Sequence, residues 1–178
     1  MNKKLVVLFP GGKYSTDCPL LYYAGFKYEV LGYDKKCVNI SKNISQNLEY
    51  EDFKSAVKIE TYEQLKDVSF SDYDEILFIS KSIGGVVAGW IQDKLQLSVK
   101  HIFLTPIPET LSYLKRDRGI KCVICGTNDK KVDLNHLQDI CSKEEILLHL
   151  IEGVGHRLEV FGDMNKNIDI LKEIVSLY

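Results

Sequence analysis

Residues 76–87 read Ile-Leu-Phe-Ile-Ser-Lys-Ser-Ile-Gly-Gly-Val-Val, and they change character midway. The first part is an apolar run that is too short for a helix and typical of a strand buried on both faces. After the small residues, apolar positions recur at helical spacing, at Val86, Val87, Trp90, Ile91 and Leu95. We therefore expect a strand, a sharp turn at the serines, and a helix.

A serine at such a turn is the arrangement of a nucleophile elbow. The turn requires small residues two positions before and two positions after the serine, because the two backbones nearly touch there. Ser82 has Ser80 and Gly84 in these positions, so the motif is G-x-S-x-G with Ser in place of its first Gly. Ser80 is the poorer candidate, since Phe78 would occupy its preceding small position. Ser82 is the candidate nucleophile.

The composition indicates an ordinary globular protein. A chain of 178 residues predicts one domain, residues 1–178, burying roughly 70% of the surface that its unfolded chain exposes. Hydrophobic residues make up 45% and charged residues 27%. The net charge of -2 gives no reason to expect nucleic acid or an anionic membrane as a partner.

The cysteines and the N-terminus favour a cytoplasmic location. An odd number of cysteines, 5, without the spacing of a disulfide framework is typical of a reducing compartment. The apolar run from Leu5 to Phe9 is too short for a signal peptide and stops at Pro10. We find no apolar stretch of transmembrane length in the sequence.

Buried strands alternate with helical segments along the whole chain. This alternation predicts a three-layer α/β/α sandwich with a mostly parallel sheet. Expected strands cover residues 5–9, 28–33, 76–80, 101–105, 121–126 and 146–151. Expected helices cover residues 17–25, 50–57, 61–68, 83–97, 109–114, 133–142 and 167–177. A C-x-x-C pair, Cys122 and Cys125, falls on an expected strand, where its two thiols would face opposite ways and belong to the core.

The first expected strand ends in a glycine-rich turn, Gly11-Gly12. It is not a Walker A loop, because Tyr14 follows Lys13 and no Gly lies five positions before Gly12. It is not a dinucleotide fingerprint either, because the third Gly is missing. Two alternatives stay open: a loop whose backbone N–H groups face a reacting carbonyl, or a plain tight turn between a strand and a helix.

Ligands of parallel sheets bind at the carboxyl ends of the strands, so a base for Ser82 should follow a strand. His149 lies within an expected strand, His136 in a helix, and His101 at the opposite edge. His156 follows the last strand in a flexible loop, Gly153-Val154-Gly155-His156. His156 is therefore the best candidate base.

An imidazole that acts as a base gains from an acceptor on its other nitrogen, which sets the tautomer. Asp129 follows the fifth expected strand in Gly126-Thr127-Asn128-Asp129, at the same edge of the sheet. Asp133 is the reserve candidate. The alternative is that Asp129 is a plain loop residue or a helix cap, since Asp is common in both places.

Ser82, Asp129 and His156 occur in that order, each just past the end of a successive buried strand. This arrangement, from Leu5 to Leu177, resembles the α/β-hydrolase superfamily. The resemblance implies Ser82 as nucleophile, His156 as general base and acid, and Asp129 as the residue that orients His156. It also implies an oxyanion hole from the backbone N–H groups of Ile83 and Gly12, with Lys13 as the alternative second donor.

The same resemblance implies the sheet order 2-1-3-4-5-6 and a carboxylesterase-like serine hydrolase. Such an enzyme cleaves an ester, thioester or amide of a small acyl substrate through an acyl-enzyme, without metal or cofactor. Residues 106–120 are too short for the usual cap domain, which indicates a small lidless form. The long polar segment Asp34–Glu60 is then the expected cover of the site.

Two other functions stay open: a non-catalytic binding protein on the same scaffold, and an acyltransferase that uses the same triad. The lysines that follow strand ends bear on the substrate. They would favour an anionic acyl group, or they lie there only because loops commonly carry Lys. These residues are Lys13, Lys35, Lys36, Lys81, Lys130 and Lys131.

Overall fold

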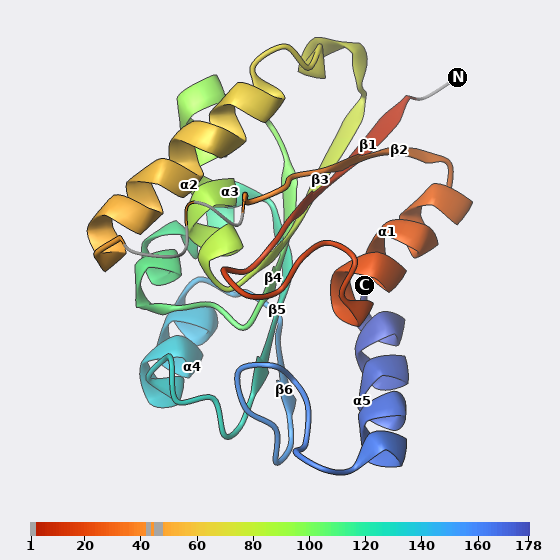
Figure 1. Ribbon diagram of the computed structural model, residues 1–178, viewed down its shortest axis with the longest axis vertical. Coiled ribbons are helices and arrows are strands. Elements are labelled where there is room, and N and C mark those ends of the chain that lie inside the picture. The colour runs from red at the N-terminus through yellow and green to blue at the C-terminus, as the bar shows by residue number, and fades with distance from the viewer. Residues whose placement is uncertain (1–2, 42–43, 45–47) are drawn as a thin grey trace.

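The computed structural model describes residues 3–41, 44 and 48–178. Its centre is a 6-stranded sheet in which every neighbouring pair is parallel, in the order β2-β1-β3-β4-β5-β6 (Figure 1). This confirms the predicted sandwich and strand order. The strands are β1 (Lys4–Phe9), β2 (Tyr33–Cys37), β3 (Glu75–Lys81), β4 (Lys100–Leu104), β5 (Ile120–Gly126) and β6 (Leu148–Ile151).

Helices cover both faces of the sheet. The α-helices are α1 (Pro19–Val30), α2 (Tyr50–Leu65), α3 (Ile83–Leu95), α4 (Leu134–Lys143) and α5 (Met164–Leu177). The connection from β4 to β5 holds only two 3-10 helices, η2 (Pro108–Tyr113) and η3 (Arg116–Arg118), so no cap domain is inserted there. Within the described parts of the chain, none of the helices has the length and apolar character needed to span a bilayer.

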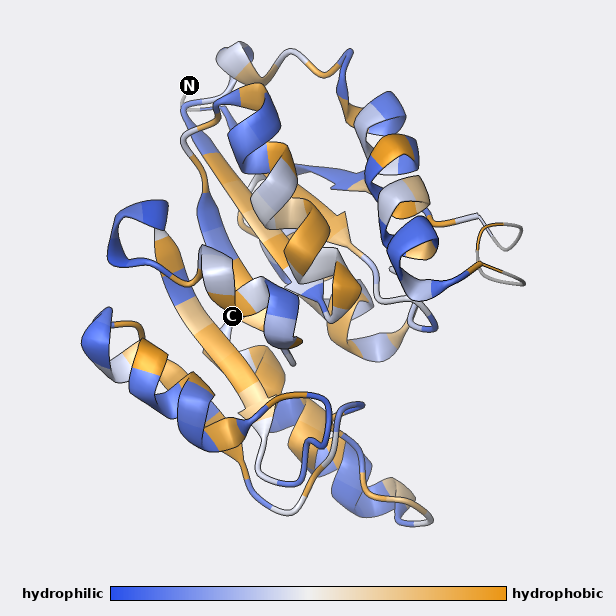
Figure 2. Ribbon diagram, turned by 90° about the vertical axis from the view of Figure 1, so that its left-hand side faces the viewer, coloured by the Kyte–Doolittle hydropathy of each residue, from blue (hydrophilic) through white to orange (hydrophobic). Residues whose placement is uncertain are grey.

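Alternate residues of each central strand enter opposite cores, as the period of two requires. Leu8 and Ile79 face α1 and α5, whereas Phe9 and Phe78 face α2 and α3. A further group of buried apolar side chains, which includes Phe103, packs under α4 on the same face of the sheet as α2 and α3. Figure 2 shows the resulting hydrophobic centre with hydrophilic residues on the outer helix surfaces. The sheet is therefore buried on both faces, which explains the continuous apolar runs.

The turn between β3 and α3 is as tight as the motif predicts. Ser82 has φ 53, a left-handed backbone conformation that is uncommon for a residue with a side chain. A Cβ added to Gly84 would lie 2.5 Å from the carbonyl oxygen of Pro10 and 2.6 Å from that of Phe9. The end of β1 thus touches the start of α3, and only a glycine fits between them.

The prediction of the second strand at residues 28–33 is wrong. Tyr28 lies on the buried face of α1, and the chain turns at Gly32 (φ +83) before β2 begins. The helix runs through Gly25, which the pattern predicted as its end. A Cβ at Gly25 would lie 2.8 Å from Leu8 Cδ1, so the glycine lets α1 approach the sheet closely instead of stopping the helix.

The two expected helices at 50–57 and 61–68 are one continuous helix, α2. Thr61, the first residue of the second expected helix, is instead buried in the interior of α2. Gln64 joins α2 to the chain after β2, since its side-chain amide donates to the carbonyl of Asn39 at 2.7 Å and accepts from the Asn39 N–H at 2.9 Å.

Cys122 and Cys125 are both buried, and they belong to different core clusters on opposite faces of the sheet. This confirms that they are core thiols of β5 and not a paired C-x-x-C motif.

We predict that Gly84→Ala lowers the free energy of unfolding by about 3 kcal/mol, because the added methyl group overlaps two backbone oxygens. Ser80→Gly, which restores the first Gly of the motif, should lower it by only about 1 kcal/mol. Urea unfolding followed by circular dichroism measures both values. Equal stability of the two variants would contradict the close contact between α3 and the end of β1.

Candidate active site

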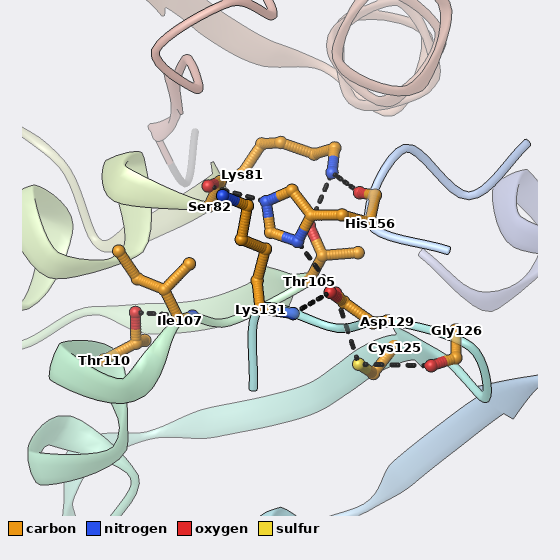
Figure 3. A network of polar contacts seen from close by, with 10 residues as sticks. All are labelled: Lys81, Ser82, Thr105, Ile107, Thr110, Cys125, Gly126, Asp129, Lys131 and His156. Atoms are coloured by element: carbon orange, nitrogen blue, oxygen red, sulfur yellow. Dashed lines mark hydrogen bonds and ion pairs between the residues drawn. The ribbon is translucent and has the colours of Figure 1, made fainter. Parts of the chain in front are cut away.

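Three loops at the carboxyl edge of the sheet bring Ser82, His156 and Asp129 together (Figure 3). Ser82 follows β3, Asp129 follows β5, and His156 follows β6. The His156 Nε2 lies 2.8 Å from Ser82 Oγ, and its Nδ1 lies 2.8 Å from Asp129 Oδ2. The three residues thus form a continuous hydrogen-bonded chain from hydroxyl to imidazole to carboxylate.

Backbone hydrogen bonds join the loops that carry Asp129 and His156. The Asn128 N–H donates to the Val154 carbonyl at 2.9 Å, and the Gly153 N–H donates to Thr127 Oγ1 at 2.8 Å. A Cβ at Gly126 would lie 2.2 Å from the Val154 oxygen, so this close approach needs a glycine. The spacing between base and acid is therefore set by the backbone.

The carboxylate of Asp129 is buried, while the His156 side chain is 25% exposed. Burial acts to raise the pKa of Asp129, but the hydrogen bonds from His156 and from the Lys131 backbone N–H outweigh it. The pKa of this carboxyl is consequently lowered. Asp129 is ionised at neutral pH and accepts a hydrogen bond from the Nδ1–H of His156.

Ile83 and Gly12, the expected oxyanion donors, line the same cleft as Ser82. Ile83 is the first residue of α3, so its N–H has no acceptor within that helix. Gly12 lies in a turn closed by mutual hydrogen bonds of Gly11 and Tyr14. Among the described residues, no acceptor contacts the N–H of Ile83 or of Gly12.

Ser82 and His156 open into a cleft of about 620 Å³. Its walls are largely apolar, and they come from the Gly12 loop, the first turn of α2, the start of α3 and the chain after β4. Part of the segment Asp34–Glu60 therefore lies against the site, as expected for a cover; residues 42–43 and 45–47 of that segment lie outside the described residues. The lining residues are Gly12, Lys13, Tyr50, Phe53, Ser82, Ile83, Ile107, Pro108, Glu109, Lys131 and His156.

The remaining histidines lie away from Ser82. His101 is buried at the start of β4, where burial, with a smaller effect from Arg118, lowers its pKa to about 3. His136 is on α4 and His149 on β6. The reserve acid Asp133 is the N-cap of α4 and accepts from the His136 N–H at 3.2 Å. Its role is structural.

The sequence patterns missed the contribution of Lys81. It appeared only as one of several lysines near strand ends, yet its side chain is buried at the site. One feature of the sequence indicated this role: Lys81 is a charged residue at the end of a fully buried strand. A buried charge requires a polar partner. Thr105, which is that partner, carries no signal in the sequence.

No family model and no curated protein matches this chain. Solved structures do match over nearly its whole length. One is an α/β serine hydrolase homologue from Coxiella burnetii, with a TM-score of 0.69, 12% identity, and coverage of 98% of this chain and 84% of that one. Another is Est1E from Butyrivibrio proteoclasticus, with a TM-score of 0.63, 9% identity, and coverage of 99% and 88%. The chain has the α/β-hydrolase fold.

Within the α/β-hydrolase fold this is a lidless form, because the connection from β4 to β5 holds only η2 and η3. The fold identifies the turn after β3 and the loops after β5 and β6 as neighbours at one edge of the sheet. It does not identify the reaction, which depends on the residues that this chain places there.

We predict that Asp129 contributes stability that depends on pH. Because its folded-state pKa is lowered, the contribution is present above its unfolded pKa of about 4 and is lost as pH falls through the folded value. The stability difference between wild type and Asp129→Asn should therefore shrink between about pH 6 and about pH 2. Urea unfolding across this range measures it.

Asp139→Asn, on the exposed side of α4, controls for the loss of one negative charge. A difference between wild type and Asp129→Asn that stays constant over the whole range would contradict the lowered pKa.

Proposed function

We propose that this protein is a serine hydrolase that cleaves an ester, thioester or amide of a small molecule through an acyl-enzyme. The observation that carries the proposal is the hydrogen-bonded chain of Ser82, His156 and Asp129 at the floor of an open cleft. A serine hydroxyl needs such a base to become nucleophilic near neutral pH.

In this mechanism the Ser82 hydroxyl attacks the carbonyl carbon of the substrate while His156 Nε2 takes its proton. Asp129 holds the Nδ1–H of His156 and stabilises the imidazolium that forms. His156 then gives the proton to the leaving group, and the acyl group remains on Ser82. A water molecule, deprotonated by His156, releases the acid and restores the enzyme.

The tetrahedral intermediate carries a negative oxygen that needs donors already in place. The N–H groups of Ile83 and Gly12 are the proposed donors, since both belong to residues that line the cleft with Ser82. The Lys13 N–H remains the alternative to Gly12. Loss of one such donor typically lowers kcat by about 10²–10³-fold.

We predict that Ser82→Ala abolishes turnover of p-nitrophenyl acyl esters, because no other hydroxyl lies within hydrogen-bonding distance of His156 Nε2 among the described residues. The fold should stay intact, as judged by circular dichroism. Release of p-nitrophenol measures turnover, and a fluorophosphonate probe should label the wild type at Ser82. Ser142→Ala, on the exposed side of α4, is the matched control.

The two alternative functions give different outcomes. A binding protein would neither turn over the ester nor react with the fluorophosphonate, which would refute the proposal. An acyltransferase would react with the probe but would transfer the acyl group to an added alcohol or amine faster than to water. Undiminished turnover by Ser82→Ala would exclude Ser82 as the nucleophile.

The cleft has features that favour an acyl group with a negative charge. Two of the six lysines near strand ends, Lys13 and Lys131, line it beside Ser82. Glu109 is the one acidic residue among the lining residues, and, after burial, it contributes to raising the pKa of the neighbouring Tyr50. The apolar wall that includes Phe53 would contact the carbon chain of the acyl group.

We predict that changing Lys13 and Lys131 together to Gln lowers the preference for an anionic acyl group about tenfold, as expected for two exposed charge contacts. The measurement is the ratio of kcat/KM for the p-nitrophenyl monoester of succinate to that for p-nitrophenyl butyrate. A double change of Lys36 and Lys130 to Gln, outside the cleft, is the matched control. An unchanged ratio would refute the charge preference and leave the hydrolase proposal standing.

A further inference from the structure

Lys81 is the last residue of β3 and directly precedes Ser82, yet its side chain points away from solvent and is 2% exposed. Its ammonium donates to Thr105 Oγ1 at 2.5 Å and to the backbone carbonyl of His156 at 2.6 Å (Figure 3). One buried cation therefore connects the ends of β3 and β4 with the loop that carries His156.

Burial of this ammonium is unfavourable by itself. Burial lowers the pKa of Lys81 to about 7, and the nearby charge of Asp129 only partly opposes the shift. The other groups that act on it are Cys125, Arg157 and Glu159, and the ring of Tyr14 lies 5.3 Å from its Nζ. An apolar residue would continue the β3 pattern without this penalty, so the lysine needs a reason beyond packing.

The acceptor Thr105, the first residue after β4, is also unusual. Thr105 has φ 44 and is fully buried, and a left-handed conformation is a genuine outlier for a β-branched residue. Its N–H donates to the Ile124 carbonyl at 2.7 Å, which fixes this backbone against β5. Local strain of this kind persists only where the surroundings impose it, and it clusters at functional sites. Here it aims the Thr105 hydroxyl at Lys81.

The loop that carries His156 is held on both sides of this residue, because the Leu158 N–H donates to the Gly155 carbonyl at 2.9 Å and Leu158 is buried. Gly153 is exposed, has φ +74 and would leave an added Cβ with no neighbour within 4 Å. The contacts of Val154 with Asn128 hold the start of the loop. The bond from Lys81 holds the backbone of His156 itself.

We propose that Lys81 is a positioning residue that keeps His156 in register with Ser82 by anchoring the His156 carbonyl to Thr105 at the end of β4. This inference rests on the proposed hydrolase function and extends it to a residue that touches neither substrate nor the reacting atoms. Without the anchor, the imidazole still reaches Asp129 but loses its fixed distance to Ser82 Oγ.

The first test is Lys81→Met, which keeps an unbranched side chain one heavy atom shorter and removes its charge and donors. We expect kcat to fall about 10²-fold with KM nearly unchanged, because a displacement of about 1 Å costs that much in a positioned reaction. Lys121→Met removes a lysine of β5 that bonds to Tyr28 Oη at 3.0 Å, far along the strand from the site, and should leave kcat unchanged.

A second variant separates positioning from folding. Lys81→Ala leaves a space shaped for three methylene groups and an ammonium, so added propylammonium should restore kcat in a saturable manner. Tetramethylammonium has a similar charge but no N–H to donate, and it should not restore activity. Rescue by both ions, or by neither in a variant that remains folded, would overturn the anchoring role.

A third measurement does not depend on activity. The proton between His156 Nδ1 and Asp129 should give a low-field ¹H NMR resonance in the wild type, and crystal structures of wild type and Lys81→Met should differ in the distance from Nε2 to Ser82 Oγ. An unchanged distance and an unchanged resonance would overturn the inference. Lack of turnover and labelling in the wild type would instead refute the hydrolase proposal, while these two readouts would still decide the role of Lys81.

Discussion

The contact between the start of α3 and the end of β1 is the constraint on which the rest of the site depends. Gly84 lies against the carbonyl oxygens of Phe9 and Pro10, so β3 must turn within one residue to become α3. That turn puts Ser82 at φ 53 and lifts its hydroxyl above the edge of the sheet. Gly12, just past the end of β1, and Ile83, the first residue of α3, line the same cleft. One packing contact thus bears on the positions of both the candidate nucleophile and the proposed oxyanion donors.

The electrostatics of the site depend on burial. Asp129 is buried but ionised, because His156 and the Lys131 N–H stabilise its charge. Lys81 is buried a short distance away, and the two opposite charges each favour the ionised form of the other. His156 lies between them, bonded to Asp129 through its ring and to Lys81 through its backbone. Its two attachments restrict both the rotation of the ring and the position of the loop.

The sequence predicted strands most accurately where both faces of a strand are buried. β1, β3, β4 and β5 were recognisable because both faces of these strands are covered and their apolar runs are continuous. β2 was misplaced because it is an exposed edge strand with Lys35 and Lys36, and its pattern carries no such run. Gly25 indicated a helix end from its type alone, but its actual role is to let α1 approach Leu8. Propensity cannot distinguish these two roles, since only the packed neighbour decides between them.

The sequence alone determined the general alternation of strands and helices, the turn at Ser82, and the placement of Asp129 and His156 just past strand ends. Chain order suffices for these, because parallel strands with right-handed crossovers bring their carboxyl ends to one edge. Only the tertiary structure decided which side chains meet there and at what distance. Lys81 and Thr105 are separated by 24 positions in the chain and are joined by one hydrogen bond. Contacts of that kind depend on the register between β3 and β4 and on the strained backbone of Thr105, which no local pattern encodes.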